Sequence, residues 1–310
     1  MGIRLARALC RWLPPLAAQR VRNRVWPLAE AQRAELFMKV RAVTGGWFEG
    51  KSNDIHAYPM LVHGYYEWRN VAICAAVLQA GETIVEVGAN VGTETVCFAD
   101  IARERGGRLV AFEPDECNFR ALVRLGELNG WKHVELIQAA VSDHDGEARF
   151  EPPPANGMSG IGRVVTGTEK GESVAVRCLR LDTMFPDESG RVGAVFMDVE
   201  GHEVAVLRGA KALLTQQRPV VVLEAHPRLL ARNGWDLAVL EAEVRDAGYM
   251  SWRIARFGLT PVDLASRRAG NWLCLPEEKR RLSRRVQGML LRAGLLPMIP
   301  GVNPLGRASE

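Results

Sequence analysis

The chain has 310 residues, of which 47% are hydrophobic and 25% are charged. This length allows one large domain with extensions or two modest domains, and the composition excludes disordered and collagen-like chains. No apolar run approaches the roughly 18 residues that a membrane-spanning helix requires, so we expect no integral membrane helix. The six cysteines form no C-x-x-C pattern and lie mostly in apolar stretches, which predicts reduced, buried thiols and a cytoplasmic location.

The net charge of +4 is unevenly distributed along the chain. Residues 1–40 carry +6 and residues 276–310 carry +4, which leaves −6 for the body between them. An acidic body is a poor candidate for a nucleic-acid groove, so we expect no nucleic-acid partner.

Both basic ends have amphipathic helical patterns. Residues 1–63 are predicted to form a basic, helical N-terminal extension, in which arginines 4, 7 and 11 alternate with Leu5, Leu9, Trp12 and Leu13. Residues 276–310 are predicted to form a basic amphipathic tail, with an apolar stripe at Leu282, Val286, Met289, Leu290 and Ala293. Such helices can pack on the body with a solvated basic face, or they can contact an anionic membrane peripherally.

Between the ends, residues 64–275 alternate short apolar runs with helical patterns, which predicts one α/β domain with a doubly wound, mostly parallel sheet. Seven strands are expected, at Thr83 to Val87, Arg108 to Glu113, Val134 to Val141, Ala194 to Val199, Pro219 to Glu224, Tyr249 to Ile254 and Asn271 to Leu275. Residues 142–190 interrupt the alternation and are predicted to be either a lid over a site or a solvated hairpin.

The first strand leads into a glycine-containing turn, Val85-Glu86-Val87-Gly88-Ala89-Asn90-Val91-Gly92. Gly88 permits a sharp turn and Gly92 permits a ligand to approach the following helix. The third glycine of a dinucleotide fingerprint is absent, and Glu86 suits a cationic ligand better than a diphosphate. Glu113 ends the second strand, where a carboxylate can accept hydrogen bonds from ribose hydroxyls. Together these residues predict a pocket for a positively charged nucleoside such as S-adenosylmethionine.

Several ordered motifs between about Gly64 and Pro227 make the chain resemble the FkbM-type S-adenosylmethionine-dependent methyltransferases. The motifs are GYYE at 64–67, VEVGANVG at 85–92, AFEP at 111–114, AAVSD at 139–143, LRLDT at 179–183 and MDVEGHEVAVLRGA at 197–210. The resemblance implies the Rossmann-like class I methyltransferase fold and S-adenosylmethionine as cofactor. It assigns the amino acid end of the donor to Glu86, Gly88, Asn90 and Gly92, the ribose to Glu113, and the adenine to Ala140, Val141 and Ser142.

Three further polar residues are candidate catalytic groups. Asp198 and Glu200 end the fourth strand, and their spacing of two places both carboxylates on one side of an extended chain. Glu200 alternatively caps the next helix. His226 follows the fifth strand and is either a proton acceptor or an ordinary polar residue fixed by Pro227. Upstream, Tyr65 and Tyr66 either line an acceptor site or pack the N-terminal extension.

These features predict transfer of a methyl group from S-adenosylmethionine to a hydroxyl of a small-molecule or glycan acceptor. No metal is expected to be required, although Asp198, Glu200 and Glu224 are able to provide ligands for one. The alternatives are a nicotinamide-dependent oxidoreductase, which the incomplete glycine pattern opposes, and a membrane-associated binding protein that keeps the nucleoside pocket without turnover.

Overall fold

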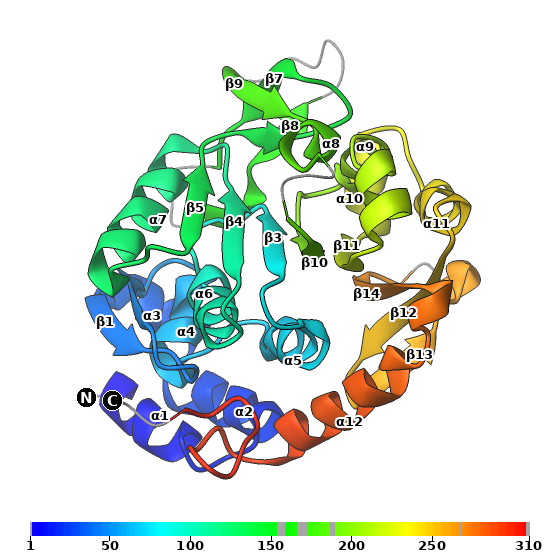
Figure 1. The fold of residues 1–310 in the computed structure, drawn as a ribbon. Helices are drawn as coiled ribbons and strands as arrows, with labels where there is room; N and C mark the ends of the chain where they lie inside the picture. The colour runs from blue at the N-terminus through cyan, green and yellow to red at the C-terminus, as the bar shows by residue number, and fades with distance from the viewer. Residues whose placement is uncertain (1, 154–158, 166–172, 187–189, 267, 308–310) are drawn as a thin grey trace.

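A computed structural model describes residues 2–153, 159–165, 173–186, 190–266 and 268–307. Its centre is an eight-stranded sheet (Figure 1) in the order β13 (Gly258–Pro261), β12 (Tyr249–Ala255), β14 (Gly270–Pro276), β11 (Val220–Ala225), β10 (Val192–Met197), β3 (Thr83–Val87), β4 (Arg108–Phe112) and β5 (Val134–Ile137). The five strands from β11 to β5 are parallel, whereas β14 runs antiparallel to both of its neighbours.

Helices cover both faces of this sheet, which confirms the doubly wound α/β fold. One face is covered by α5 (Trp68–Val77), α6 (Thr95–Glu104), α7 (Glu116–Asn129) and α12 (Leu282–Leu295). The other is covered by α8 (Leu181–Met184), α9 (Glu203–Arg208), the π-helix η3 (Leu213–Gln217), α10 (Pro227–Arg232) and α11 (Leu237–Asp246). The parallel strands β3, β4 and β10 are buried on both sides, so they appear in the sequence as short, largely apolar runs.

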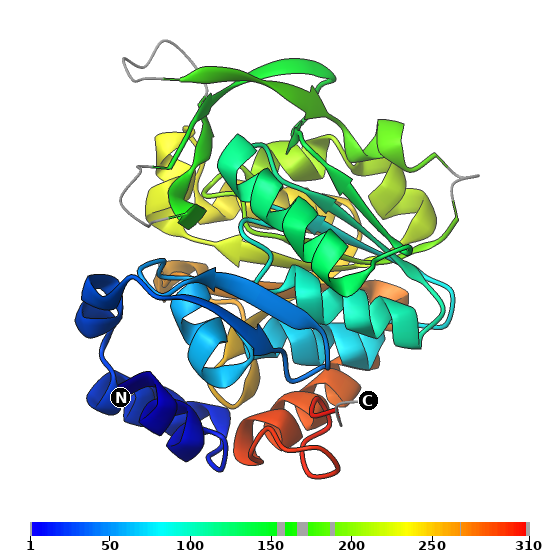
Figure 2. The same ribbon diagram turned by 90° about the vertical axis from the view of Figure 1, so that its left-hand side faces the viewer.

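Two details of the sheet differ from the prediction. An eighth strand, β13, pairs antiparallel with β12 and forms the edge of the sheet. The expected third strand is divided after Ile137, and Ala140 and Val141 form β6 (Ala140–Val141), which joins a different sheet. This second sheet has the order β6, β9 (Val174–Leu179), β7 (Gly146–Glu151) and β8 (Arg163–Val165), and Figure 2 shows it above the main sheet.

The expected insertion at 142–190 thus carries most of the second sheet, together with the 3-10 turn η1 (Ser159–Ile161). Within the insertion, β7 pairs antiparallel with β9. The segments 154–158, 166–172 and 187–189 lie outside the described residues.

The N-terminal extension is not purely helical. It contains α1 (Gly2–Cys10), α2 (Pro15–Val25), α3 (Leu28–Ala34) and α4 (Ala57–His63), but also an antiparallel pair of strands, β1 (Phe37–Arg41) and β2 (Trp47–Lys51). Short 3-10 turns, η4 (Leu264–Ser266) and η5 (Glu277–Lys279), occur near the other end of the chain.

The two terminal helices pack on the body through their small apolar residues. In α12, Val286, Leu290 and Ala293 are buried, as the predicted stripe requires. In α1, Ile3, Ala6 and Cys10 are buried, whereas Leu5, Leu9 and Trp12 of the predicted amphipathic pattern are exposed. The smaller side chains allow α1 to approach α2 and α4 closely, so packing selects them over the bulkier leucines.

All six cysteines are free, and five are buried as expected, whereas Cys117 is exposed. None of the described helices combines the length and the hydropathy needed to cross a bilayer.

Candidate active site

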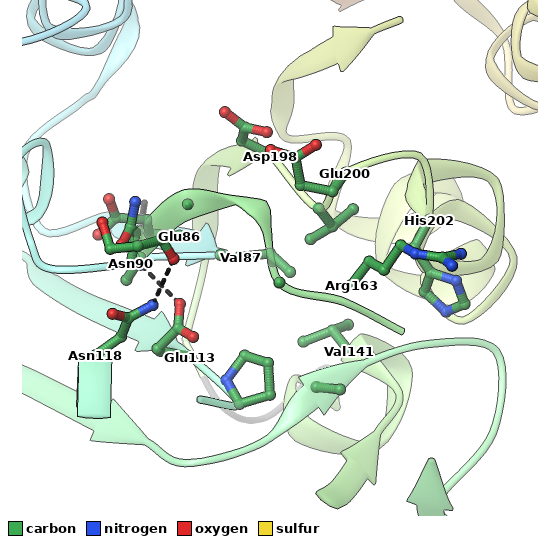
Figure 3. A pocket seen from close by; sticks show the side chains of 18 of the residues that line it. Glu86, Val87, Asn90, Glu113, Asn118, Val141, Arg163, Asp198, Glu200 and His202 are labelled. Atoms are coloured by element: carbon green, nitrogen blue, oxygen red, sulfur yellow. Dashed lines mark hydrogen bonds between the residues drawn. The ribbon is translucent and has the colours of Figure 1, made fainter. Parts of the chain in front are cut away.

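A cavity lies at the carboxyl ends of β3, β4 and β10. In doubly wound sheets ligands bind where neighbouring strands lead to opposite sheet faces, and β3 and β10 are such a pair here. Residues from the main sheet, the second sheet and the N-terminal extension line the cavity (Figure 3): His56, Tyr66, Glu86, Val87, Gly88, Ala89, Asn90, Thr93, Glu94, Glu113, Pro114, Asn118, Ala139, Ala140, Val141, Phe150, Ser159, Gly160, Gly162, Arg163, Val164, Asp198, Val199, Glu200 and His202.

The turn after β3 forms the floor of the cavity. Gly88 has φ +86°, and a Cβ at this position would lie 2.1 Å from the carbonyl oxygen of Asp198. Glycine is therefore required both for the turn and for the close approach of the chain that follows β10. Gly92 has a different role from the predicted ligand contact: a Cβ there would lie 2.5 Å from Leu125 Cδ1, so this glycine permits α7 to pack, and it does not line the cavity.

Glu86 carries a buried carboxyl group that lines this cavity. Its Oε2 has no hydrogen-bond partner among the described residues, and burial raises the pKa of Glu86 to about 8. An unsatisfied buried carboxyl oxygen is costly unless a ligand donates to it. The position therefore suits a cationic donor group such as an ammonium.

Glu113, at the end of β4, is held by two backbone amides. The amide nitrogen of Asn90 donates to Glu113 Oε2 at 2.7 Å, and the amide nitrogen of Asp115 donates to Oε1 at 2.9 Å (Figure 3 shows Asn90 and Glu113 together). Burial raises the pKa of Glu113 to about 7, and the two amide bonds partly oppose this rise. Each carboxyl oxygen keeps a lone pair for a further donor, as two ribose hydroxyls require.

The segment after β5 provides the apolar side of the cavity. Ala140 and Val141 line it, whereas Ser142 does not. Ser142 is buried behind this wall, with its hydroxyl 2.8 Å from Nε2 of His202. Ala140 and Val141 present small apolar surfaces that suit a flat aromatic ring such as adenine.

Asp198 and Glu200 line the opposite side of the cavity and lie next to each other in Figure 3. Asp198 is open to the cavity but enclosed by surrounding protein, and this loss of bulk water, followed by the charge of Glu224, raises its pKa to about 8. Burial and then the charge of Asp198 raise the pKa of Glu200 to about 7. The cavity therefore holds a carboxyl group that changes charge close to neutral pH.

The backbone at Glu200 is strained. Its φ is +53°, a left-handed conformation that non-glycine residues rarely adopt, and Gly201 follows at φ +96°. Such strain is typical of functional sites, where surrounding structure holds a side chain in a required place. The alternative helix-capping role is not observed, because α9 begins at Glu203 and has no side-chain cap.

The second sheet closes the cavity through η1. The backbone of Ser159 donates to Asp54 Oδ2 at 3.1 Å and accepts from Asn118 Nδ2 at 2.9 Å, so it is fixed from two sides. At the next residue, a Cβ on Gly160 would lie 2.1 Å from Cε1 of His56. The insertion thus contacts both the N-terminal extension and the start of α7 at the edge of the site.

The histidines are placed differently from the prediction. His226 precedes α10 and is not among the residues lining the cavity, so its position gives no support for a role as base. His202 lines the cavity instead, and burial lowers its pKa to about 4, which makes it a neutral imidazole at pH 7. The signal that could have identified His202 is its position two residues after Glu200, across the turn at Gly201.

Tyr65 and Tyr66 differ in role: one packs the N-terminal extension and the other lines the cavity. Tyr65 is buried and stacks on His63, with ring centroids 5.1 Å apart, so it belongs to the packing of the extension. Tyr66 lines the cavity, edge-on to His56 at 5.5 Å. Among the described residues, no group of three or more histidine, cysteine or acidic side chains is arranged to hold a metal ion.

Comparisons with known proteins agree with this geometry. The sequence model of the family described as "Methyltransferase FkbM domain" matches residues 86–250, which is more than half of the chain. No match was found among curated proteins.

Several solved structures have similar folds at low sequence identity. An FkbM methyltransferase from Methylobacillus flagellatus KT is 15% identical, with a TM-score of 0.42, and the alignment covers 83% of this chain but only 60% of that protein. TYW2 of M. jannaschii, solved with AdoMet, is 12% identical with a TM-score of 0.41, covering 77% of this chain and 84% of the other. A Streptococcus mutans protein solved with SAH is 8% identical with a TM-score of 0.39, covering 66% of this chain and 94% of the other.

The family match decides between the two nucleoside ligands considered from the sequence, in favour of S-adenosylmethionine over a nicotinamide dinucleotide. With its class I methyltransferase fold, the chain belongs to the FkbM methyltransferase family, whose methyl donor is S-adenosylmethionine.

Proposed function

We propose that this chain transfers a methyl group from S-adenosylmethionine to a hydroxyl group of a glycan or another hydroxylated metabolite. The observation that carries the proposal is Glu200, a strained residue that lines the donor cavity and has a pKa of about 7. A hydroxyl acceptor must lose its proton as the new carbon–oxygen bond forms, and a carboxyl group with a pKa near the working pH is suited to take it.

The residues of the cavity divide into donor and acceptor sides. Glu86 and Asn90 would hold the amino acid end of the donor, Glu113 the ribose, and Ala140 and Val141 the adenine. When bound, S-adenosylmethionine supplies a methyl group already activated by a positively charged sulfur. The protein then has to orient the acceptor oxygen in line with that methyl group and remove its proton.

The acceptor side is rich in groups that accept hydrogen bonds from hydroxyls. Asp198 and Glu200 provide carboxyl oxygens, and Tyr66, which interacts electrostatically with Asp198, adds an aromatic surface to the cavity. Sugars present several hydroxyls beside apolar ring faces, so carboxylates next to an aromatic ring suit them. In the reaction, the acceptor oxygen bonds to the methyl carbon, the carbon–sulfur bond breaks, and the hydroxyl proton passes to Glu200.

A labelled donor tests the reaction class. Metabolite and glycan extracts incubated with the protein and S-adenosylmethionine carrying a deuterated methyl group should yield products whose fragment masses place the label on oxygen. Label on nitrogen or carbon would refute O-methylation. No labelled product, despite donor binding by calorimetry, would instead favour a binding protein without turnover.

Once a product is found, Glu200→Gln tests the role of the base. Removal of a general base should lower kcat by about 10² to 10⁴ with donor affinity largely kept. His226→Gln is the matched control and should keep the parent rate, because His226 does not line the cavity. The reverse pattern, a slow His226 variant and a normal Glu200 variant, would show that Glu200 is not the base.

A further inference from the structure

The two basic ends of the chain meet on one side of the molecule. Figures 1 and 2 show α1, α2 and α12 along the same end, with both termini there, and α2 contacts both α1 and α12. This end, called the terminal face below, exposes six large apolar side chains: Leu5, Leu9, Trp12, Leu291, Leu295 and Val302.

These side chains are not the core-facing residues of their helices. Burial of α1 uses Ile3, Ala6 and Cys10. Leu5 and Leu9 of α1 and Trp12, two residues beyond its end, have the i, i+4, i+7 spacing of a single helix face. Trp12 is 65% exposed, which is an unusually open position for an indole. α12 repeats the arrangement, since Leu291 and Leu295 lie outside its buried stripe.

The charge of the same segments is entirely of one sign. Residues 1–29 contain six arginines and no acidic residue, and residues 279–307 contain seven basic residues and no acidic residue. Within the described part of the chain, only Arg307 of this set forms an ion pair, with Glu104. Arg4, Arg11, Arg284 and Arg292 are exposed beside the apolar side chains.

We propose that the terminal face docks onto an anionic lipid bilayer, independently of the proposed methyl transfer. Leucine and tryptophan enter the boundary between headgroups and acyl chains, and the arginines contact lipid phosphates, which is the pattern of interfacial helices. A soluble acidic partner would satisfy the arginines but leaves the scattered leucines of two separate helices unexplained. A flat, fluid and negatively charged surface satisfies both at once.

Vesicle sedimentation tests this docking. The full-length protein should sediment with vesicles of equimolar phosphatidylcholine and phosphatidylglycerol at low salt, release at high salt, and stay in solution with pure phosphatidylcholine. In the variant Leu5→Ser/Leu9→Ser/Trp12→Ser the partition coefficient should fall at least tenfold. Each of Arg4→Gln and Arg292→Gln should lower it about fivefold.

Val174→Ser is the matched control, because Val174 is 50% exposed and belongs to β9, at the opposite end of the molecule in Figure 1. It should bind vesicles like the parent protein. All variants should keep the melting temperature and the affinity for S-adenosylmethionine, because the substituted side chains are exposed and remote from the cavity.

The docking proposal is overturned if the parent protein does not bind anionic vesicles or if the triple variant binds them as well as the parent. A dimer that the triple variant abolishes, without vesicle binding by the parent, would assign this face to a second copy of the chain instead.

Discussion

Binding of S-adenosylmethionine should release protons, because the donor is expected to place an ammonium group beside Glu86. Burial raises the pKa of Glu86 to about 8 in the free protein, so at pH 7 about nine-tenths of these side chains are protonated. An adjacent cation favours the carboxylate and lowers its pKa. At pH 7 the binding event should therefore release about 0.9 proton from Glu86, and fewer as the pH rises past 8.

Calorimetry in buffers with different ionisation enthalpies measures this number directly. Glu86→Gln should remove about 0.9 proton from the release at pH 7 and weaken donor binding by about 1.5 to 3 kcal/mol, the range for a hydrogen bond to a charged group. Glu113 and Glu200, each with a pKa of about 7, should account for the release that persists in this variant.

Glu203→Gln is the matched control. Burial raises the pKa of Glu203 to about 8 as well, but Glu203 accepts from the backbone amides of Val199 and Gly201 and does not line the cavity. This variant should release the same number of protons as the parent on donor binding. Unchanged proton release and affinity in Glu86→Gln would show that Glu86 does not contact the donor, and the assignment of this end of the cavity would then be wrong.

Three further outcomes follow from the same geometry. Glu113→Ala should weaken donor binding by about 1.5 to 3 kcal/mol in calorimetry, and an unchanged affinity would remove Glu113 from the site. In Gly160→Ala the added Cβ would collide with His56, so the contact between these two residues at the edge of the cavity should loosen. The donor should then dissociate faster in stopped-flow measurements. An unchanged dissociation rate would mean that this contact does not retain the donor. The free protein should melt at lower temperature as the pH rises from about 6.5 to about 8. In that range the raised pKa values of groups such as Glu86 and Glu200 make the folded state bind more protons than the unfolded one. A melting temperature that rises over this range would contradict these pKa directions. Below about pH 6.5 the lowered pKa of His202 acts in the opposite sense, because the unfolded chain then binds the additional proton.

The central sheet was predictable because its strands are buried on both faces. Thr83–Val87 and Val192–Met197 are short, fully buried and largely apolar runs, and such runs can be recognised in the sequence. β13 was missed, since Gly258–Pro261 is a half-exposed edge strand containing a glycine and a proline. Its pairing with β12 depends on the hairpin between them rather than on a hydrophobic pattern.

The donor side of the cavity could be anticipated because each residue lies within one position of the end of a strand. Glu86, Gly88 and Glu113 are placed by the ends of β3 and β4 alone. The contact between the insertion and the N-terminal extension at the edge of the cavity could not be anticipated, because His56 and Gly160 come from segments more than a hundred residues apart. Neither segment has a local sequence pattern that predicts this contact.

The orientation of α1 shows a different limit of sequence reasoning. Both of its stripes, Ile3 with Ala6 and Leu5 with Leu9, are apolar at helical spacing, so periodicity identifies the helix without selecting its buried face. The selection comes from the neighbouring helices, which admit small side chains at close range. The more hydrophobic stripe therefore faces outward, and this outcome gives the terminal face its apolar character.

The carboxyl groups of the cavity link donor binding to proton transfer in the proposed reaction. Because Asp198 and Glu200 share a poorly solvated space, burial and then the charge of Asp198 disfavour the ionised form of Glu200 in the free protein. A bound cationic donor offsets this repulsion, so the pKa of Glu200 should fall below its value of about 7 and leave the carboxylate ready to accept a proton. Methyl transfer removes the positive charge from sulfur, which raises the pKa of Glu200 again at the moment when it holds the acceptor's proton. The positive charge of the donor thus favours an ionised Glu200 before methyl transfer. Loss of that charge favours a protonated Glu200 after it.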